Sequence, residues 1–319
     1  VDSDDLGYLL PTGLPGLREA VADRLGTRYD FTVEADDVAL LGTTGTGLNL
    51  SVRAFSEPGD EILLLTPLYP PFRVAVETSG RVPVEVELTN GADGYSIDFE
   101  ALERAVTDKT AMLMICNPHN PVGRVFTATE LTGLADFAQK HDLTLVSDDL
   151  HSDLLFDGRH VPLASLDHPM AQRTVTLYGP TKAFNLPGLK ISFAISKDHD
   201  MLERMNAAGA GLASPPNILA QAATLGAYRE GHAWLAEVLD YLRGNRDYLL
   251  ERVARTMPKV KVHKPEATYL AWLDLRAFDL GPNVAEVLAE RAKVGLNDGA
   301  SFGKGGEGFV RFNFGTNRA

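Results

Sequence analysis

The chain alternates short apolar runs with longer segments of helical spacing. Seven apolar runs have the length and composition of strands: Val38 to Leu41, Glu61 to Thr66, Val82 to Leu88, Ala111 to Cys116, Leu143 to Ser147, Val175 to Tyr178 and Ile191 to Ile195. Helical spacing is found at Leu14 to Leu25, Thr46 to Phe55, Phe99 to Ala105 and Thr127 to Lys140. Strands that alternate with helices predict an α/β fold whose mostly parallel sheet is covered on both faces.

The last third of the chain has a different pattern. From about Asn217 to Met257 the spacing is almost entirely helical, with an interruption near Gly231. Segments typical of strands return at Tyr269 to Leu275 and at Phe309 to Phe314. We therefore predict a large domain over residues 1–230 and a smaller C-terminal α/β domain over residues 231–319.

Composition and charge limit the possible partners. With 319 residues, 45% of them hydrophobic, the chain can bury a large core. Its formal net charge of −13 comes from acids spread along the sequence, so nucleic acids and anionic membranes are not expected as partners. The single cysteine, Cys116, allows no internal disulfide. Together with the lack of an apolar stretch of ~20 residues, this favours a cytoplasmic protein.

Ligands of open parallel sheets bind beyond the carboxyl ends of the strands, so the residues that follow each apolar run are of interest. The first run is followed by Gly42-Thr43-Thr44-Gly45-Thr46-Gly47 and then by a helix. Hydroxyls and backbone N–H groups at a helix N-terminus suit a phosphate group. The order of glycines is not that of a dinucleotide or nucleoside triphosphate loop. An ordinary turn and helix cap is an equally good interpretation of this motif alone.

Two further strand ends carry groups suited to a flat polar ligand. Tyr69 lies among prolines directly after the second run, where its ring can stack on an aromatic ligand or simply pack against neighbours. The run that ends at Cys116 continues into a loop, residues 117–123, with two Asn-Pro steps. Such steps restrict the backbone, and a rigid loop here would present the amide of Asn120.

An acid follows the run Leu143 to Ser147. Asp148 comes directly after residues that we expect to be buried, so it needs a cationic partner. His151 lies three residues further on, which leaves a metal site or a solvated acidic loop as alternatives. A metal site is disfavoured because no second cluster of histidines completes a ligand set, and we predict no bound metal.

The most informative residue is Lys182, which follows the run Val175 to Tyr178 in an apolar loop rich in proline and glycine. A lysine that is partly desolvated has a lowered pKa and can act as an amine nucleophile, although most lysines are solvated surface residues. A phosphate cup, a flat aromatic, an amide, a buried acid and a constrained lysine match the groups of pyridoxal 5′-phosphate (PLP). These groups are its phosphate, ring, phenolic oxygen, ring nitrogen and aldehyde.

Over essentially its whole length the sequence resembles the fold-type I PLP enzymes of the class I/II aminotransferase superfamily. Within them it is most similar to the cystathionine β-lyase, or carbon–sulfur lyase, branch. The resemblance is carried by Arg53-Ala54-Phe55 and by residues 66–72, 117–123, 148–154, 181–189 and 265–272. It implies the PLP-dependent transferase (aspartate aminotransferase-like) fold, a homodimer with shared active sites and a small amino acid as substrate.

The resemblance also implies roles for single residues. Lys182 would form the Schiff base with PLP, Asp148 would bind the pyridine nitrogen, and Tyr69 would stack on the ring. Arg311, in Val310-Arg311-Phe312-Asn313, would bind the substrate α-carboxylate. The remaining implied cofactor ligands are Asn120 at the phenolic oxygen, His151, Tyr8 from the neighbouring subunit, and Thr43, Thr44, Gly45, Thr181 and Lys190 around the phosphate.

The resemblance favours one reaction and leaves two others open. His151 stands where aminotransferases usually have tyrosine, and this favours a carbon–sulfur β-lyase that cleaves cystathionine or related cysteine S-conjugates to pyruvate, ammonia and a thiol. The first alternative is an aminotransferase, which uses the same residues. The second is a regulatory protein that only senses PLP or its ligand, against which the lack of a basic DNA-binding segment argues.

Overall fold

The computed structural model describes Gly7 and residues 10–318, and it confirms the α/β class. Its main sheet has seven strands in the order β1-β9-β8-β7-β6-β2-β3. They are β1 (Val38–Leu41), β2 (Glu61–Thr66), β3 (Val82–Glu87), β6 (Thr110–Cys116), β7 (Thr144–Asp148), β8 (Thr174–Tyr178) and β9 (Ser192–Ile195). Only β9 runs antiparallel to its neighbours, as expected for a mostly parallel sheet.

Helices cover both faces of this sheet. They are α1 (Leu17–Tyr29), α2 (Thr44–Phe55), α3 (Pro71–Thr78), α4 (Phe99–Ala105), α5 (Ala128–Lys140), α6 (His199–Ala208) and α7 (Ile218–Glu230). Side chains alternate along β2: Ile62 and Leu64 pack in a cluster with α2, α3 and α6, whereas Leu63 and Leu65 pack in a cluster with α5. The continuous apolar strands are therefore buried on both sides.

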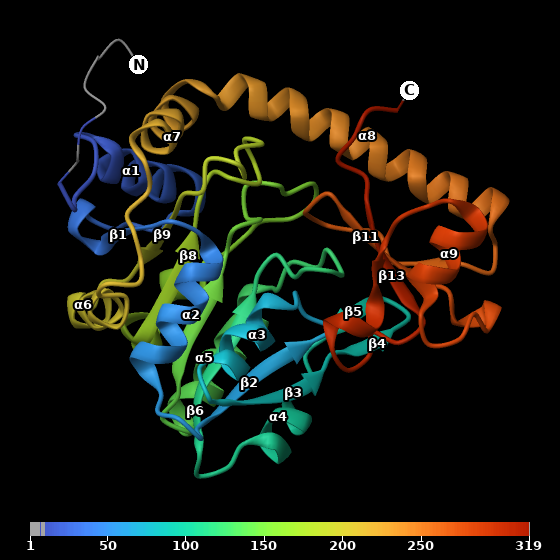
Figure 1. Cartoon of the computed structure of the whole chain (residues 1–319), viewed down its shortest axis with the longest axis horizontal. Coiled ribbons are helices and arrows are strands. Elements are labelled where there is room, and N and C mark those ends of the chain that lie inside the picture. The colour runs from blue at the N-terminus through green and yellow to red at the C-terminus, as the bar shows by residue number, and fades with distance from the viewer. Residues whose placement is uncertain (1–6, 8–9, 319) are drawn as a thin grey trace.

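A second, four-stranded antiparallel sheet lies at one end of the molecule, in the order β10-β11-β13-β12 (Figure 1). Its strands are β10 (Lys261–Val262), β11 (Leu270–Asp274), β12 (Asn297–Asp298) and β13 (Phe309–Asn313). The helices α8 (His232–Thr256) and α9 (Val284–Ala292) accompany it. A hairpin of β4 (Thr89–Gly91) and β5 (Gly94–Ser96) lies beside this small sheet in Figure 1.

The long α8 connects the two sheets. The predicted interruption near Gly231 is confirmed, because α7 ends at Glu230 and α8 begins at His232. A Cβ atom at Gly231 would lie 2.5 Å from the carbonyl oxygen of Ala227, so the tight junction requires glycine. The division into domains at this position stays a prediction. Among the described residues, no helix combines the length and the apolar character that a membrane span requires.

The structure corrects several predicted boundaries. The helix α2 begins at Thr44 rather than Thr46, because the Thr43 hydroxyl accepts a hydrogen bond from the Thr46 N–H and caps the helix. Helix α3 was not foreseen, because prolines were interpreted as a loop signal; proline in fact suits the first helical position, where α3 starts with Pro71. The helices α6 and α9 and the β4–β5 hairpin were likewise absent from the prediction.

Candidate active site

A cavity of about 160 Å³ lies where β2, β6, β7 and β8 end, between the large sheet and β13. Six predicted site residues line it together: Tyr69, Asn120, Asp148, His151, Lys182 and Arg311. They come from positions between 69 and 311 of the chain, and the carboxyl ends of the parallel strands bring most of them to one edge.

Asp148 is a buried acid that forms no ion pair with any residue that the structure describes. It is the last residue of β7, and its Oδ1 accepts a hydrogen bond of 3.0 Å from the Leu150 N–H. Burial raises the pKa of the Asp148 carboxyl to about 7, the Asp149 charge adds to the rise, and the Leu150 N–H and the Lys182 charge oppose it. A carboxyl in this state favours a ligand that brings a positive charge and a hydrogen to it.

Lys182 follows β8 in a turn and is partly buried. Burial lowers the pKa of its ammonium group, and the positive charge of Arg311 acts in the same direction, while Asp148 opposes both. No hydrogen bond or ion pair to Lys182 is found within the described part of the chain. The amine is therefore shifted toward its neutral, nucleophilic form.

Arg311, on β13, is a half-buried guanidinium without an acidic partner among the described residues. Its Nη1 donates to Asn120 Oδ1 at 2.9 Å and its Nη2 donates to Asn297 Oδ1 at 3.0 Å. Its Nε is buried and has no hydrogen-bond partner within residues 10–318. The guanidinium also lies 5.9 Å from the ring centroid of Tyr69. Two neutral amides orient the group and leave its charge for an anionic ligand.

His151 is neutral in this surrounding. Burial lowers its pKa to about 3, and the charges of Lys182 and Arg311 add to the effect. Its Nδ1 is buried and lacks a hydrogen-bond partner among the described residues, and its ring meets Tyr269 edge-on at 5.8 Å. The imidazole can therefore serve as a neutral hydrogen-bonding group, but it is not in the imidazolium form that could act as a general acid at neutral pH.

The residues predicted around a phosphate do not line the 160 Å³ cavity. Thr44 and Gly45 form the first turn of α2, where backbone N–H groups have no acceptor within the helix, whereas the Thr43 hydroxyl is used by the cap. A Cβ atom at Gly47 would lie 2.7 Å from Leu177 Cδ2, so this glycine lets α2 approach the end of β8. Thr181 is buried and Lys190 is exposed.

Several residues around the site were not predicted. Cys116, Leu150, Tyr269, Leu270 and Asn313 also line the cavity. Asn297 orients Arg311, yet it belongs to a strand of two residues that leaves no pattern in the sequence. Tyr269 lies within the quoted segment 265–272, which is the signal that could have identified it.

A buried pair supports the strand end that carries Asp148. The carboxylate of Asp149 accepts a hydrogen bond from the Ser147 hydroxyl and lies 2.9 Å from His160 Nε2. No pattern along the chain indicated that His160 reaches this position. Tyr8, which the resemblance places in a neighbouring site, lies outside the described residues. In the part of the chain that the structure describes, no three metal-ligating side chains are grouped to hold a metal ion.

This geometry fits a cofactor with an anionic group, an aldehyde and a protonated ring nitrogen. The helix α2 offers N–H groups to an anion, Lys182 offers an amine, and Asp148 needs a cationic hydrogen donor. Arg311 remains available to an anionic group of a second ligand. Together, the fold and the cavity define an enzyme that reacts with a small amino acid through a bound carbonyl cofactor.

The comparisons agree with this class, and the chain belongs to the aminotransferase class I and II family, whose model matches residues 2–319. It is 36% identical to cystathionine beta-lyase PatB of Bacillus subtilis, over 100% of this chain and 83% of that protein. It is 30% identical to an aspartate aminotransferase of Pyrococcus abyssi, over 95% of this chain and 78% of that protein.

A solved structure confirms the predicted fold. Cystalysin from Treponema denticola, whose structure contains pyridoxal 5′-phosphate, matches with a TM-score of 0.93 at 31% identity. The match covers 98% of this chain and 81% of that chain. The aspartate aminotransferase-like architecture and the membership of the class I/II superfamily that the sequence predicted are therefore both correct.

Proposed function

We propose that this chain is a PLP-dependent carbon–sulfur β-lyase that cleaves cystathionine or a related cysteine S-conjugate. The observation that carries the proposal is the single cavity that unites Lys182, Asp148 and an Arg311 without an acidic partner among the described residues. In this role the enzyme converts an S-substituted cysteine and water to pyruvate, ammonium and a thiol.

When bound, PLP supplies an aldehyde that joins the substrate amine and a ring that withdraws electrons from the α-carbon. Lys182 would hold the cofactor through its amine and would be the base that takes the α-proton, since its pKa is lowered. Asp148 would keep a proton on the ring nitrogen, because an ion pair there would offset the free-energy cost of its own buried charge. Arg311 binds the α-carboxylate and so directs the α-hydrogen toward Lys182.

The other predicted cofactor ligands complete the site in this proposal. Tyr69 would stack on the ring, Asn120 would bind the phenolic oxygen, His151 would be a further cofactor contact, and the N-terminus of α2 would hold the phosphate. The phosphate ligands there are Thr43, Thr44, Gly45, Thr181 and Lys190. Thr46, whose hydroxyl lies 2.9 Å from that of Thr43, is an additional candidate that the prediction omitted.

The lining of the cavity favours a substrate with one carboxylate at the reacting end. Arg311 is the only arginine that lines it within the described residues. A second arginine would be expected for the side chain of a dicarboxylic amino acid. An aminotransferase remains the alternative activity, since it needs the same lysine, acid and guanidinium.

The products decide between elimination and transamination. With cystathionine or an S-alkyl cysteine and no keto acid, we expect pyruvate, ammonium and thiol to form over many turnovers. A transaminase would stop after one turnover, because its cofactor then carries the amino group. A keto acid that retains sulfur and appears only when an acceptor is added would reject the lyase. Absence of all turnover would favour a ligand sensor.

Arg311→Lys should raise KM roughly 10- to 100-fold for the amino-acid substrate. The substitution keeps the positive charge but removes the parallel pair of donors, and a charge-assisted hydrogen bond contributes about 1.5–3 kcal/mol. The visible absorption of the bound cofactor should stay unchanged. Arg204→Lys is the matched control, because Arg204 is exposed and donates to the Ala54 carbonyl far from the site. An unaltered KM in Arg311→Lys would show that Arg311 does not bind the substrate α-carboxylate.

The quaternary arrangement and the location of the protein stay predictions. A homodimer with shared active sites is expected, with Tyr8 reaching the neighbouring site, and the buried Cys116 agrees with a reducing cytoplasm.

A further inference from the structure

A buried ion pair connects α1 with the segment that follows Asp148. Arg24, on α1, donates to the Asp153 carboxylate through Nε at 3.1 Å and Nη2 at 2.8 Å. Each side chain is 2% exposed, and among the described residues no other arginine or lysine forms an ion pair in which both side chains are so deeply buried. Neither residue lines the active-site cavity, so the proposed reaction gives this pair no direct part.

Three further donors surround the Asp153 carboxylate. The Tyr29 hydroxyl donates to Oδ1 at 2.6 Å, the Tyr178 hydroxyl donates to Oδ2 at 2.9 Å, and Arg28 Nε lies 2.7 Å from Oδ1. Burial acts to raise the pKa of the Asp153 carboxyl, but the nearby arginine charges and the hydrogen bonds lower it below its usual value. The group is therefore a carboxylate with donors on both oxygens. We call these five residues, Arg24, Arg28, Tyr29, Asp153 and Tyr178, the Asp153 cluster.

The Asp153 cluster contacts the turn of Lys182 at both ends. Tyr178 is the last residue of β8, four positions before Lys182, and its hydroxyl also accepts a hydrogen bond of 3.0 Å from Arg24 Nε. After Lys182, the Arg24 guanidinium lies 5.2 Å from the ring centroid of Phe184. The Phe184 N–H donates to the Pro180 carbonyl at 2.9 Å and so closes the turn. Arg24 thus contacts residues that precede and follow Lys182.

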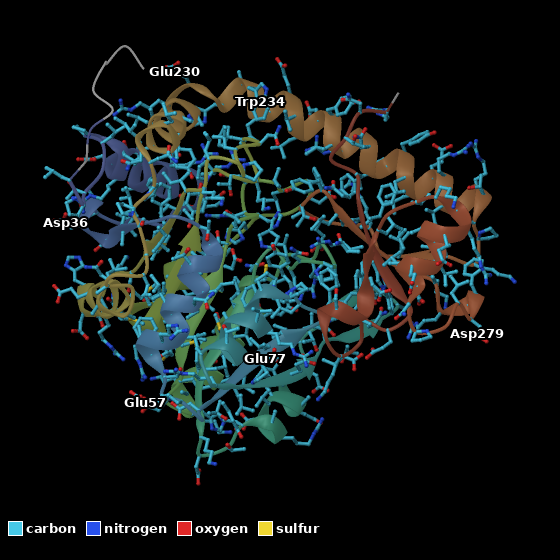
Figure 2. The ribbon with its side chains drawn as sticks, in the orientation of Figure 1. Asp36, Glu57, Glu77, Glu230, Trp234 and Asp279 are labelled. Atoms are coloured by element: carbon cyan, nitrogen blue, oxygen red, sulfur yellow. The ribbon has the colours of Figure 1, made fainter. Side chains whose placement is uncertain are left out.

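Aromatic neighbours complete the support of Phe184. Its ring meets the Tyr228 ring at a centroid distance of 5.9 Å, and the Arg24 guanidinium lies 4.9 Å from the Tyr228 centroid. The Phe184 ring also stacks on Trp234 at 6.1 Å, and Trp234 lies at the surface near the start of α8 (Figure 2). The turn of Lys182 is therefore packed against α1, α7 and α8 together.

The cluster also supports the segment that carries His151. Asp153 lies between His151 and Leu154 in the sequence, and the Leu154 N–H donates to the His151 carbonyl at 2.9 Å. The Thr268 N–H donates in turn to the Leu154 carbonyl at 2.8 Å, directly before Tyr269, which lines the cavity. Asp153 is therefore linked along the backbone to two residues of the cavity wall.

Stability alone does not account for a buried ion pair. Removing two charges from water is costly, and apolar side chains of similar volume often stabilise a protein as well or better. We propose that Arg24 and Asp153 are positioning residues that fix the turn of Lys182. The amine is thereby held in the cavity, where the charges of Asp148 and Arg311 act on it. This role rests on the proposed function, in which Lys182 holds the cofactor and takes the α-proton.

Arg24→Lys tests this role. Lysine keeps the positive charge but cannot reproduce the two parallel hydrogen bonds to Asp153 or the contact of a planar guanidinium with the Phe184 ring. The apoprotein of the variant should capture PLP at least ~10-fold more slowly than the parent, because a misplaced amine reacts less often. The visible absorption that appears on binding measures this rate. In the holoenzyme, kcat should fall while KM for an S-alkyl cysteine changes little, since Arg311 stays in place.

Arg246→Lys is the matched control. The Arg246 side chain is likewise 2% exposed, forms an ion pair with Asp157 and lies 5.1 Å from the ring centroid of Phe156, but its hydrogen-bond partners lie outside the turn of Lys182. This variant should melt at a lower temperature, as Arg24→Lys does, yet keep PLP capture and kcat near the parent values. Parent values in Arg24→Lys would overturn the positioning role. An equal loss in both variants would overturn it as well, because it would reflect a general effect of a buried lysine.

Phe184→Leu covers the case in which Arg24→Lys does not fold. It leaves every charge of the Asp153 cluster in place and removes the ring that joins the cluster to the turn, so PLP capture and kcat should fall again. Phe55→Leu is its control, because Phe55 is also 7% exposed and has the guanidinium of Arg204 at 5.0 Å from its ring centroid. Normal PLP capture in Phe184→Leu would contradict the proposal.

Capture of PLP requires no amino-acid substrate, so its rate does not depend on whether elimination or transamination follows. Transamination products from the parent would reject the lyase and leave the positioning role intact. A parent apoprotein that captures no PLP would contradict both.

Discussion

Lys182→Ala is expected to reduce turnover by at least ~10³-fold, the largest effect of any single substitution in this chain. The variant loses both the amine that holds the cofactor and the base that removes the α-proton, and proton transfer alone contributes about 10²–10⁴-fold. No other lysine lines the cavity within the described residues. Initial rates of pyruvate release from an S-alkyl cysteine measure the effect.

The covalent role of Lys182 has a direct check. After reduction with borohydride, peptide mapping should find the cofactor on Lys182, and in Lys182→Ala no lysine should be labelled in its place. Lys259→Ala serves as the control, because this exposed lysine lies away from the cavity and its loss should change neither labelling nor rate. A label on another lysine would contradict the assignment.

Asp148→Asn is expected to slow α-proton removal by ~10²-fold or more while the cofactor stays bound. An amide cannot balance the charge of a protonated ring nitrogen, so the ring withdraws electrons less effectively. Exchange of the substrate α-hydrogen with deuterated water measures this step separately from the release of thiol. Exchange at the normal rate in the variant would show that Asp148 does not act on the ring.

The same substitution should stabilise the protein when no cofactor is bound. The pKa of Asp148 is raised from 3.8 to about 7, so between these pH values the folded state binds more protons than the unfolded state. The free energy of unfolding therefore falls as the pH rises through this range. Without PLP, Asp148→Asn should therefore melt a few degrees higher than the parent at pH 8, at roughly 2–4 °C per kcal/mol. The difference should shrink toward pH 5.

With cofactor bound, the sign should reverse, because Asp148 then has a cationic partner that asparagine lacks. If the parent protein is as stable as Asp148→Asn at pH 8 without cofactor, burial does not raise the pKa of the Asp148 carboxyl. Differential scanning calorimetry of both proteins, with and without PLP, covers these outcomes.

Local patterns in the sequence were sufficient for the fold class and for the central residues. Strands buried on both faces need continuous apolar runs, and together with the shorter alternating run of β3 at the edge these made the seven strands of the large sheet predictable from the sequence. A lysine, an acid and an aromatic directly after such runs point to one sheet edge, and Lys182, Asp148 and Tyr69 do line one cavity. The positions of the strand ends in the sequence were sufficient to predict that these three side chains lie at the same edge of the sheet.

The pKa shifts and the orientation of the site residues depend on contacts between segments that are distant in the sequence, and only the tertiary structure reveals these contacts. The lowered pKa of Lys182 arises from burial and from Arg311, which is far away in the sequence, and Asn297 orients Arg311 from a strand of two residues. Pairs such as Asp149 with His160 and Trp272 with Phe302 likewise leave no periodic signal, because their geometry is set by packing. The sequence by itself therefore determined the architecture and the cofactor chemistry, whereas burial and long-range contacts determined the charges of the side chains in the site.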